Sequence, residues 1–324
     1  MTAKSNSDTL ITVYGGSGFL GRHVVRALAK RDYRIRVAVR RPDLAFHLQP
    51  LGRVGQIHAV QANLRDAPSV EAAARGADVL INLVGILAES GRQRFDTIHS
   101  FGAEQVALAA SAHGARMVHV SALGADEQSP AAYARSKAVA ERLVLAAQPS
   151  AIIMRPSILF GPEDDFFNRF AALARMSPVL PLIGGGHTKF QPVFVGDVAK
   201  AIAAATEDKL RTGIIYELGG PEVRTFKELM QFILATIERN RMLVPLPFFA
   251  AKFKALFLQF APSPLTLTPG QVDMLRTDNI VSEKAVTERR TLQGIGIEPE
   301  TIEAIVPSYL WRFRRTGQFK SRAA

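Results

Sequence analysis

Short apolar segments alternate with amphipathic segments through the first half of the chain. Apolar runs between polar residues predict strands, and apolar residues spaced three and four apart predict helices. The predicted strands are residues 10–13, 33–39, 56–60, 78–84, 116–120 and 151–155. The predicted helices are residues 22–30, 70–75, 102–113 and 133–147. This alternation predicts an α/β fold with a doubly wound parallel sheet and helices on both of its faces.

The rhythm loosens after Arg155, where loops rich in glycine and proline appear. Further segments are predicted as a strand over 190–195, a helix that begins at Asp197 as its N-cap, a strand over 214–218 and a helix over 225–240. We therefore expect a nucleotide-binding domain formed by 1–155 and 191–220. A smaller, interleaved C-terminal region is expected over 156–190 and 221–324.

Three glycines lie between the first predicted strand and the first predicted helix. Gly15 suits a tight turn with positive φ, Gly18 a close approach of a pyrophosphate, and Gly21 the packing of the helix on the strand. The helix N-terminus would then present free N–H groups and its positive dipole end to phosphates. This arrangement predicts dinucleotide binding; the alternative is a glycine-rich turn that binds nothing.

Composition narrows the chemistry that the chain can support. The 324 residues include no cysteine and 7 scattered histidines, so thiolate catalysis is excluded and no metal site is expected. No apolar run is long enough to span a bilayer, and residues 1–8 lack the features of a signal or transit peptide. The formal net charge of +11 indicates an anionic partner.

The second predicted strand ends in two arginines. In an NAD-binding fold, an acidic residue about 20 residues past the glycines usually binds the ribose 2′-hydroxyl. Here Arg40 and Arg41 occupy that place, and guanidinium groups pair well with a 2′-phosphate. The pair therefore favours NADP(H) over NAD(H); the alternative is two solvated surface arginines.

Tyr133 and Lys137 form a Y-x-x-x-K pair on a predicted helix. At positions i and i+4 they share one helix face, where the ammonium is expected to lower the pKa of the tyrosine and make it an acid or base. Two weaker candidates follow strands: Asn63 could reach an adenine, and Asn82–Gly85 ends a strand that passes the cofactor. Asp66 could cap a helix.

Several stretches together carry a resemblance to a known family. They read VYGGSGFLGRHVV, HLQPLGRVGQI, INLVGIL, VHVSALGA, YARSKAVAE, RPSILFGPEDDFFNRF, FQPVFVGDVAKAI, PSPLTLTPGQVDMLRTDNIV and PSYLWRFRRTGQF. The chain resembles extended, atypical short-chain dehydrogenases/reductases of the NAD-dependent epimerase/dehydratase type. More narrowly, it is similar to the nucleotide-binding accessory subunits of mitochondrial respiratory complex I and their bacterial relatives. The resemblance covers nearly the whole chain.

The resemblance implies a Rossmann core with bound NADPH and a small, membrane-facing C-terminal region. It assigns catalysis to Tyr133 and Lys137. The residues that it assigns to the cofactor are Gly15, Ser17, Gly18, Phe19, Leu20, Gly21, Arg40, Arg41, Asn63, Leu64, Val84, Gly85, Ser121, Tyr133, Lys137 and Pro156. Pro156 could instead only end a strand.

One departure from the family pattern bears on activity. Active members use a serine or threonine two residues after Ser121, where this chain has Leu123, and an asparagine where our placement gives His99. Leucine cannot donate a hydrogen bond to a carbonyl or to the tyrosine. Tyr133 and Lys137 could therefore serve as cofactor ligands rather than catalysts, and we expect His99 to be a buried or otherwise satisfied histidine.

Two functions of different class follow. The first is an NADP(H)-binding accessory or assembly factor at the membrane, for a respiratory or quinone-making complex. The second is an NADP-dependent reductase or epimerase acting on a lipophilic, quinone-like substrate. Leu123 favours the first function, whereas Tyr133 and Lys137 favour the second. Nucleic-acid binding is not favoured, because no basic stripe with interleaved aromatic residues covers the nucleotide-binding region.

Residues 242–260 contain an aromatic stripe and two lysines, Lys252 and Lys254, without an acid. The stripe comprises Phe249, Phe253, Leu256, Phe257 and Phe260 at helical spacing, which fits a helix lying in a membrane interface. The basic tail, 311–322, adds Arg312, Arg314, Arg315, Lys320 and Arg322 around Trp311 and Phe313. We expect a cytoplasmic protein that binds the inner membrane peripherally; the alternative is that the stripe is core.

Overall fold

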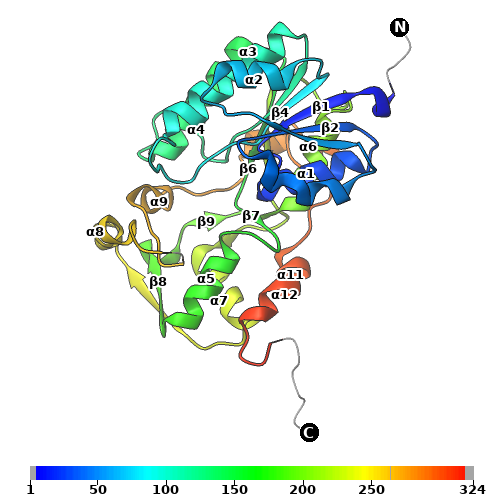
Figure 1. Cartoon of the computed structure of the whole chain (residues 1–324). Coiled ribbons are helices and arrows are strands. Elements are labelled where there is room, and N and C mark those ends of the chain that lie inside the picture. Colours follow the sequence, from blue (N-terminus) through cyan, green and yellow to red (C-terminus); the bar gives the residue numbers. More distant parts are fainter. Residues whose placement is uncertain (1–4, 263, 318–324) are drawn as a thin grey trace. The chain divides into compact units, whose positions relative to one another are not determined.

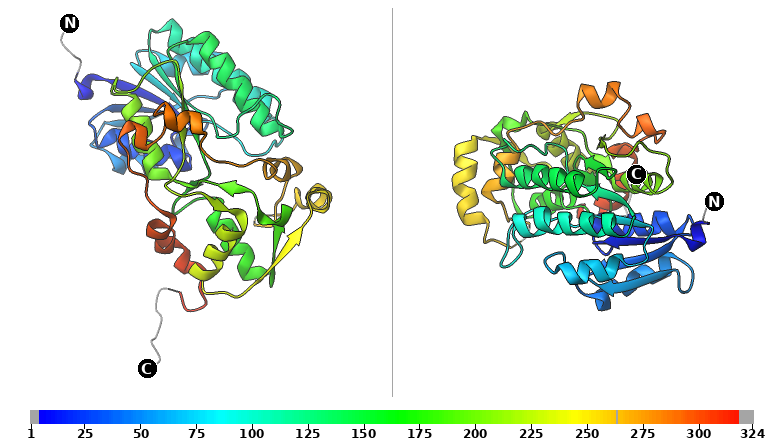
Figure 2. Two further views of the ribbon diagram at one scale, coloured as in Figure 1. Left: turned by 180° about the vertical axis from the view of Figure 1, so that it is seen from behind. Right: turned by 90° about the horizontal axis from the view of Figure 1, so that it is seen from above.

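The structure is a computed structural model that describes residues 5–262 and 264–317. The chain divides into two compact units. The larger unit comprises Met1–Pro156, Gly196–Leu218 and Glu283–Ile297, and the smaller comprises Ser157–Val195, Gly219–Ser282 and Glu298–Ala324. The boundaries predicted from the sequence differ from these chiefly for residues 283–297, which the prediction assigns to the smaller region and the structure to the larger unit. In the structure this segment lies beside the last strand of the larger unit, where Arg290 O accepts the N–H of Glu217 (Figure 2, orange in the left view).

A seven-stranded parallel sheet forms the centre of the larger unit. Its strands, in spatial order, are β11 (Ile215–Leu218), β6 (Ile152–Pro156), β5 (Arg116–Val120), β4 (Val79–Asn82), β1 (Leu10–Tyr14), β2 (Arg34–Val39) and β3 (Ile57–Gln61). The doubly wound parallel sheet predicted from the sequence is confirmed. β5 has the predicted bounds, and the other strands differ from the prediction by one or two residues at one or both ends.

Helices cover both faces of this sheet (Figure 1). The helices of the larger unit are α1 (Phe19–Ala29), α2 (Ala67–Ala74), α3 (Gly102–Ala112), α4 (Ala132–Ala147), α6 (Val195–Ala205) and α10 (Glu283–Thr287). α2, α3 and α4 lie together on one face, where alanines and valines form much of the core with the strands. Small residues let these helices approach the sheet closely.

α6 begins two residues earlier than the sequence pattern indicates. Because it starts at Val195, Asp197 lies in its first turn and is not its N-cap, which corrects the prediction. The Asp197 side chain is fully buried, and its Oδ1 accepts a hydrogen bond from Lys200 Nζ at 2.8 Å. An acid in the first turn suits the helix dipole, so the residue contributes to the helix without capping it.

The smaller unit packs around a core of phenylalanines and leucines. Its helices are α5 (Phe167–Met176), α7 (Phe226–Thr236), α8 (Phe248–Leu258), α9 (Pro269–Met274), α11 (Ile302–Ile305) and α12 (Pro307–Leu310). Its strands are β7 (Leu159–Phe160), β8 (Val179–Ile183), β9 (Lys189–Phe190), β10 (Val193–Phe194), β12 (Arg224–Thr225) and β13 (Met242–Leu246). The strand predicted over 190–195 is thus two short strands, and 242–246 is a strand paired with β8.

Side chains accept the first N–H groups of α7 and α5, although only α7 has a capping side chain at its N-cap residue. Thr225 and Glu228 form a reciprocal capping box at α7, as Thr-x-x-Glu favours. Asp164 accepts the N–H groups of Phe167 and Asn168 at the start of α5, and the hydroxyl of Tyr309 donates to it at 2.5 Å. The Tyr309 contact joins residues far apart in sequence, so local patterns do not predict it.

Candidate cofactor-binding and active site

The glycine turn after β1 is shaped by close backbone approaches. Gly15 has φ +80°, and a Cβ at Gly21 would lie 2.4 Å from Gly15 O. Both glycines are therefore required by the turn and by the packing of α1 on it. Gly16 is a third requirement that the sequence analysis missed, since a Cβ there would lie 2.9 Å from Val37 Cγ1. A Cβ at Gly18 would make only an ordinary contact, so its predicted role toward a cofactor stays a prediction.

α1 opens directly from this turn. Gly18 is its N-cap and gives no side-chain cap, and the helix has no acid in its first turn. The first intrahelical bond of this end is Arg22 N to Gly18 O, so the N–H groups of Phe19, Leu20 and Gly21 face out of the helix. With Ser17 half-buried beside them, these donors and the helix dipole suit an anionic group such as a diphosphate.

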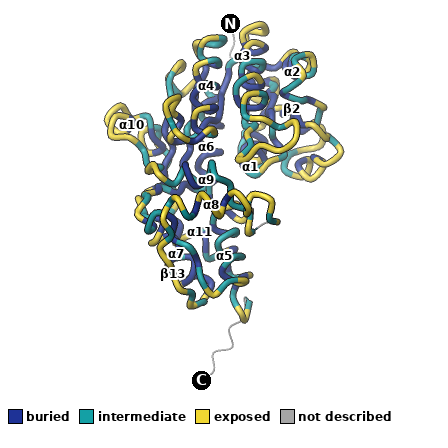
Figure 3. The backbone as a smooth tube through the Cα atoms, turned by 90° about the vertical axis from the view of Figure 1, so that its left-hand side faces the viewer, coloured by how far each residue is buried: buried dark blue, intermediate teal, exposed yellow. Residues whose placement is uncertain are grey.

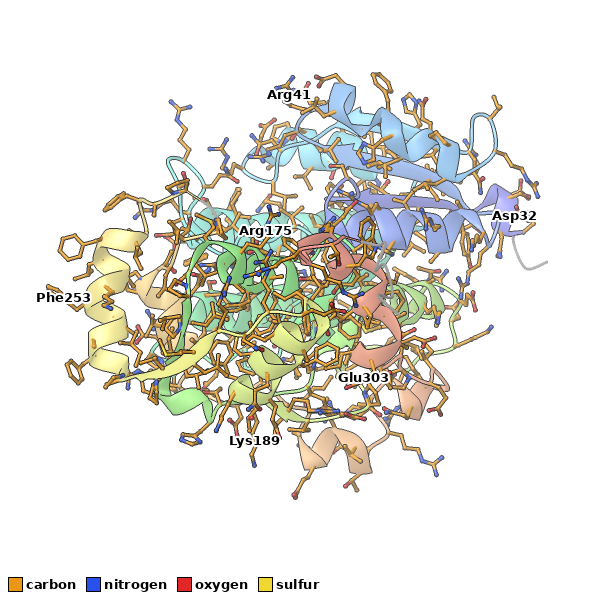
Figure 4. The ribbon with its side chains drawn as sticks, turned by 90° about the horizontal axis from the view of Figure 1, so that it is seen from below. Asp32, Arg41, Arg175, Lys189, Phe253 and Glu303 are labelled. Atoms are coloured by element: carbon orange, nitrogen blue, oxygen red, sulfur yellow. The ribbon has the colours of Figure 1, made fainter. Side chains whose placement is uncertain are left out.

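The two arginines at the end of β2 differ in their surroundings. Both are exposed, and Figure 4 shows Arg41 at the periphery of the larger unit. Arg41 Nη2 lies 2.8 Å from Asp43 Oδ2, and this hydrogen bond raises the pKa of Arg41 and lowers that of Asp43. Arg40 has no ion-pair partner among the described residues. An acid, Asp43, therefore lies near this site, but it pairs with Arg41. Arg40 is thus the guanidinium more available for a phosphate.

Asn63 and Leu64 lie in a tight turn after β3. Asn63 Oδ1 accepts the N–H of Arg65 at 3.2 Å, and Leu64 is buried where a Cβ on Gly102 would come within 2.8 Å of it. Asp66 is the N-cap residue of α2, but its side chain makes no capping hydrogen bond. Ser69 closes the turn instead, donating to Asp66 O at 2.8 Å.

α4 carries Tyr133 and Lys137 one turn apart, as predicted. Lys137 is 4% exposed, and its Nζ donates to Val120 O at 3.1 Å. Burial lowers the pKa of Lys137 to about 8, although Glu141 opposes this shift. Burial also raises the pKa of Tyr133 to about 12. The expectation that Lys137 lowers the tyrosine pKa is therefore wrong for the protein alone, because the desolvation of Tyr133 dominates.

His99 lies on a π-helical segment, Asp96–Phe101, between β4 and α3. Its Nε2 accepts the N–H of Ile86 at 3.0 Å, and its Nδ1 lies 2.8 Å from Ser136 Oγ. Ser136 donates to Tyr133 O, so the ring proton belongs on Nδ1 and donates to the serine. Burial and then Lys137 lower the pKa of His99 to about 2. The expectation of a buried, satisfied histidine is confirmed, and His99 is neutral.

The histidine ring also packs edge-on against Tyr133, with ring centroids 5.6 Å apart. The Tyr133 hydroxyl makes no hydrogen bond with any residue that the structure describes. Leu123, which stands where the family resemblance leads us to expect a hydroxyl, is buried, and its own N–H donates to Pro156 O at 3.0 Å. The protein therefore supplies no serine or threonine donor at residue 123 for a substrate carbonyl.

Two buried polar atoms at the carboxyl end of β5 lack a hydrogen-bond partner among the described residues: His119 Nε2 on the strand and Ser121 Oγ directly after it. Their residues share one side of the strand, because side chains alternate along it. Asn82 Nδ2 lies 3.3 Å from His119 Nδ1, which leaves the proton on Nε2. Burial and Lys137 lower the pKa of His119 to about 3.

Unsatisfied buried polar atoms are costly, so these two atoms at the end of β5 fit a site completed by a polar ligand. Val84 and Gly85 lie beside this site: a Cβ on Gly85 would lie 3.3 Å from Lys137 Nζ, and a Cβ on Gly15 would lie 3.0 Å from Val84 Cγ2. His119 was not among the predicted site residues; its signal is a histidine between apolar residues of a predicted strand.

Comparison with known proteins identifies the family. Residues 11–219 match the NAD dependent epimerase/dehydratase family. The chain belongs to this family. It is 38% identical to the mitochondrial NADH dehydrogenase (ubiquinone) 1 alpha subcomplex subunit 9 of Arabidopsis thaliana, over 97% of this chain and 80% of that protein. It is 37% identical to a ceramide reductase of Caulobacter vibrioides, over 60% of each chain.

Solved structures agree on the fold. An NADPH-dependent quinone oxidoreductase of Escherichia coli, solved with NADPH, superposes with a TM-score of 0.73 at 21% identity, covering 93% of this chain and 99% of that one. The resemblance to complex I accessory subunits that the sequence motifs indicate is therefore confirmed, and so is the Rossmann fold of an NAD(P)-binding epimerase/dehydratase family member.

Behind the site, this member of the epimerase/dehydratase family carries a charge network that the sequence analysis missed. Arg155 on β6 binds the Glu141 carboxylate with Nε at 2.8 Å and Nη2 at 2.5 Å. Glu217 on the neighbouring strand lies 4.0 Å from Arg155 Nη1. Glu141 is 4% exposed and lies one helical turn beyond Lys137. The network thus holds the helix that carries Lys137 against the sheet.

The predicted aromatic stripe of the smaller unit is solvent-exposed. Phe249, Phe253 and Phe257 are 77%, 65% and 66% exposed, and Leu256 and Phe260 are exposed as well. Figure 3 shows α8 mostly in the colour of exposed residues, and Figure 4 shows Phe253 projecting from it. Only Ala251 and Ala255 of α8 are buried. The alternative that the stripe is core is therefore contradicted.

The charges near these aromatics are partly neutralised. Lys252 Nζ lies 2.7 Å from Asp273 Oδ2, so the acid absent from 242–260 is supplied by α9. In the tail, Arg312 donates to Asn168 at 2.6 Å and Arg314 lies 3.7 Å from Glu238, while Phe313 is buried. Arg314 is therefore paired with an acid outside the tail, whereas the neutral amide of Asn168 leaves the charge of Arg312 in place.

Lys320 and Arg322 lie outside the described residues. Within residues 5–262 and 264–317, no helix is long and apolar enough to cross a bilayer. The same part of the chain holds no group of three or more histidines and acids arranged to bind a metal ion.

Proposed function

We propose that this protein binds NADP(H) and acts as an accessory or assembly factor at a membrane, for respiratory complex I or a quinone-making complex. The observation that carries the proposal is the pairing of a complete nucleotide turn with Leu123 in place of the family hydroxyl. A protein that keeps its cofactor site and lacks a substrate-polarising donor suits binding or sensing better than rapid turnover. The complex I subunits among its relatives support a respiratory partner.

The residues that would hold the cofactor follow from the site. The glycine turn and the first turn of α1 bind the diphosphate, and Arg40, with Arg41, binds a 2′-phosphate. Lys137, Tyr133 and Ser121 hold the nicotinamide end together with Val84, Gly85 and Pro156. Bound NADP(H) supplies a hydride or accepts one. His99 holds the loop after β4 against α4, because it bonds to Ile86 and Ser136.

The exposed stripe on α8 supports peripheral membrane binding at the cytoplasmic face. Aromatic side chains that are two-thirds exposed lose unfavourable hydration when they enter the interfacial region. Lys254 is the lysine of this helix that could contact lipid phosphates, since Lys252 is paired with Asp273. We therefore assign the aromatic residues, rather than the charge of the helix, the larger share of this contact.

The second candidate is an active NADP-dependent reductase or epimerase on a lipophilic, quinone-like substrate. Tyr133 and Lys137 support it, because a tyrosine beside a buried lysine is the proton-transfer pair of active short-chain dehydrogenases. A ceramide reductase among the relatives supports a substrate of lipid character. In this function Tyr133 would hold and transfer the proton, and Leu123 would pack against an apolar substrate.

Native mass spectrometry of protein extracted gently from membranes tests the proposal. The expected result is protein that retains NADP(H), together with a respiratory or quinone-biosynthesis partner, and that consumes NADPH negligibly with lipophilic ketones. Recovery without any nucleotide would overturn the proposal. Rapid NADPH consumption with a co-purified ketone or quinone would replace it with the reductase function.

A further inference from the structure

The smaller unit gathers three arginines at the ends of two helices and a fourth near residue 313. Arg175 lies in the last turn of α5, Arg239 and Arg241 follow α7, and Arg315 follows Phe313. Burial lowers the pKa of Arg239 first, and the charges of Arg241, Arg315 and Arg175 lower it further. Arg241, Arg315 and Arg175 thus each lie near Arg239. Hydrogen bonds from Arg241 to Ala174 O and from Arg239 to Phe313 O bring the same segments together, and we call these four residues the arginine cluster.

The fold uses two members of the cluster without neutralising them. Arg241 Nε donates to Ala174 O at 2.8 Å, and Arg239 Nε donates to Phe313 O at 3.0 Å. These bonds satisfy carbonyls and fix the positions of the guanidinium groups, but a carbonyl leaves the positive charge in place. The cluster is thus held rigidly by the backbone rather than by ion pairs.

The other two members have no structural role of this kind. Arg175 and Arg315 are exposed and make no hydrogen bond or ion pair with any residue in the described part of the chain. Neighbouring Arg314 differs, because Glu238 lies 3.7 Å from it. The cluster therefore offers two held guanidinium groups and two free ones to an anion, and guanidinium groups pair well with phosphate oxygens.

Exposed apolar side chains adjoin the cluster. Met176 directly follows Arg175, Met242 directly follows Arg241, and the two methionines are 63% and 64% exposed. Their backbones are close, because Met242 pairs with Val179 in the β8–β13 ladder and its N–H donates to Pro178 O. A free phosphate or a nucleic acid backbone gives such methionines nothing to contact, whereas a lipid presents acyl chains directly beneath its phosphate.

We infer that the arginine cluster binds the phosphate headgroup of an anionic phospholipid, with Met176 and Met242 entering the adjoining acyl region. This inference rests on the proposed membrane role and adds a headgroup site to it. The site is distinct from the α8 stripe, since β13 separates Arg241 from α8 and Figure 4 shows Arg175 well apart from Phe253.

The test uses Arg175→Gln with Arg315→Gln, because these two side chains make no contact that folding requires. The matched control is Lys189→Gln with Lys227→Gln, which removes the same charge from exposed lysines of the same unit; Figure 4 shows Lys189 apart from Arg175. The measurement is co-sedimentation of the full chain with phosphatidylcholine vesicles that contain or lack phosphatidylglycerol. Thermal unfolding checks that both variants fold.

We expect wild-type binding to increase with phosphatidylglycerol, and the arginine variant to lose about tenfold or more of that binding. The lysine control should lose less than about twofold, and inorganic phosphate at constant ionic strength should compete poorly. Equal losses in both variants would overturn the site in favour of diffuse charge attraction. Complete competition by inorganic phosphate would overturn it in favour of a free-phosphate site.

Two further outcomes separate this site from the membrane role. If wild type pellets with no vesicle, both fail. If vesicle binding survives the arginine changes but is lost when Phe249 and Phe253 become serine, the membrane role stands and the headgroup site is overturned. A single-stranded oligonucleotide provides the last comparison: loss of its binding in the arginine variant, with vesicle binding intact, would also overturn the site.

Discussion

The Glu141 carboxylate accepts two hydrogen bonds from the Arg155 guanidinium, at 2.8 and 2.5 Å, one helical turn beyond Lys137. This pair joins α4 to β6 and sets the electrostatic surroundings of the buried ammonium. Burial favours neutral Lys137, and Glu141 favours the charged form. The carboxylate therefore has two effects, one on the stability of the fold and one on the charge presented to a cofactor.

Glu141→Gln should weaken both effects. The free energy of unfolding should fall by about 3 kcal/mol, because the guanidinium of Arg155 loses its bidentate partner. The pKa of Lys137 should fall below its value of about 8. As the pH rises, the ammonium is then lost earlier, so NADPH affinity should begin to decline at a lower pH than in wild type. Urea unfolding and NADPH titration across pH measure the two effects.

The control for Glu141→Gln is Glu104→Gln on α3, whose carboxylate has no ion pair among the described residues. It should leave both properties unchanged. An unaltered pH profile in Glu141→Gln would mean that Lys137 is insensitive to this carboxylate.

His99 makes the fold sensitive to acid. Its pKa is lowered to about 2 in the folded protein, against an ordinary value near 6.5, so the unfolded chain binds more protons between these values. The stability that neutral His99 contributes is present above about pH 6.5 and is lost as the pH falls, by about 1 kcal/mol per pH unit. His119 should add a similar slope, with its pKa lowered to about 3.

His99→Asn should therefore flatten the pH dependence of urea unfolding between about pH 6.5 and 5. Asparagine retains a donor and an acceptor for Ser136 and Ile86. The exposed His47→Asn is the control and should leave the slope as in wild type. A slope in His99→Asn equal to that of wild type would show that the acid sensitivity arises elsewhere.

Arg40 should determine cofactor choice more strongly than Arg41. Arg41 is held by Asp43, whereas Arg40 is free of acids among the described residues, so Arg40→Ala should cost about tenfold to a hundredfold in NADPH affinity. NADH affinity should change little. Arg41→Ala should have a smaller effect, and Arg34→Ala, at the other end of β2, almost none. Calorimetric titration that gives equal affinities for NADPH and NADH in wild type would refute the assignment.

Sequence patterns predict the sheet well because its strands are short, apolar and separated by clear turn residues. β5 has the bounds expected from its apolar run, and Gly15 and Gly21 have the roles expected from the turn. Residues that depend on distant contacts could not be found this way. Glu141, for example, pairs with Arg155 on another element. The Arg41–Asp43 pair is local, yet it was also not predicted, because strand and helix periodicity do not register side-chain contacts of this kind.

The pKa of Tyr133 shows the same limit at the level of chemistry. A Y-x-x-x-K spacing puts two side chains on one face of a helix, but it carries no information on burial. In the folded protein desolvation raises the tyrosine pKa to about 12. A lysine four residues away is therefore an insufficient basis for predicting an activated tyrosine without a bound cofactor.

Leu123→Ser should increase NADPH consumption with lipophilic ketones. A hydroxyl at residue 123 would supply the donor that the site lacks, and one positioned donor is worth about a hundredfold in rate. Leu123→Ala is the control, since it opens the same space without a donor and should give no gain. Rapid wild-type turnover that collapses in Tyr133→Phe would instead show that Tyr133 and Lys137 suffice for catalysis.

The last prediction concerns the aromatic stripe of α8. Replacing Phe249, Phe253 and Phe257 with serine should reduce co-sedimentation with phosphatidylcholine–phosphatidylglycerol vesicles by at least about tenfold, because each phenylalanine buries a large apolar surface in the interface. The fold should tolerate the changes, since all three side chains are at least 65% exposed. Phe46→Ser in the larger unit is the matched control, because Phe46 is 60% exposed.

High salt should weaken wild-type binding only in part, because aromatic burial is insensitive to screening while the contribution of the basic residues is not. Binding that vanishes in salt yet survives the serine substitutions would mean that charge alone holds the protein to the surface. The stripe on α8 would then have to face a protein partner, and the respiratory complex implied by the relatives would be the first one to test by cross-linking from Phe253.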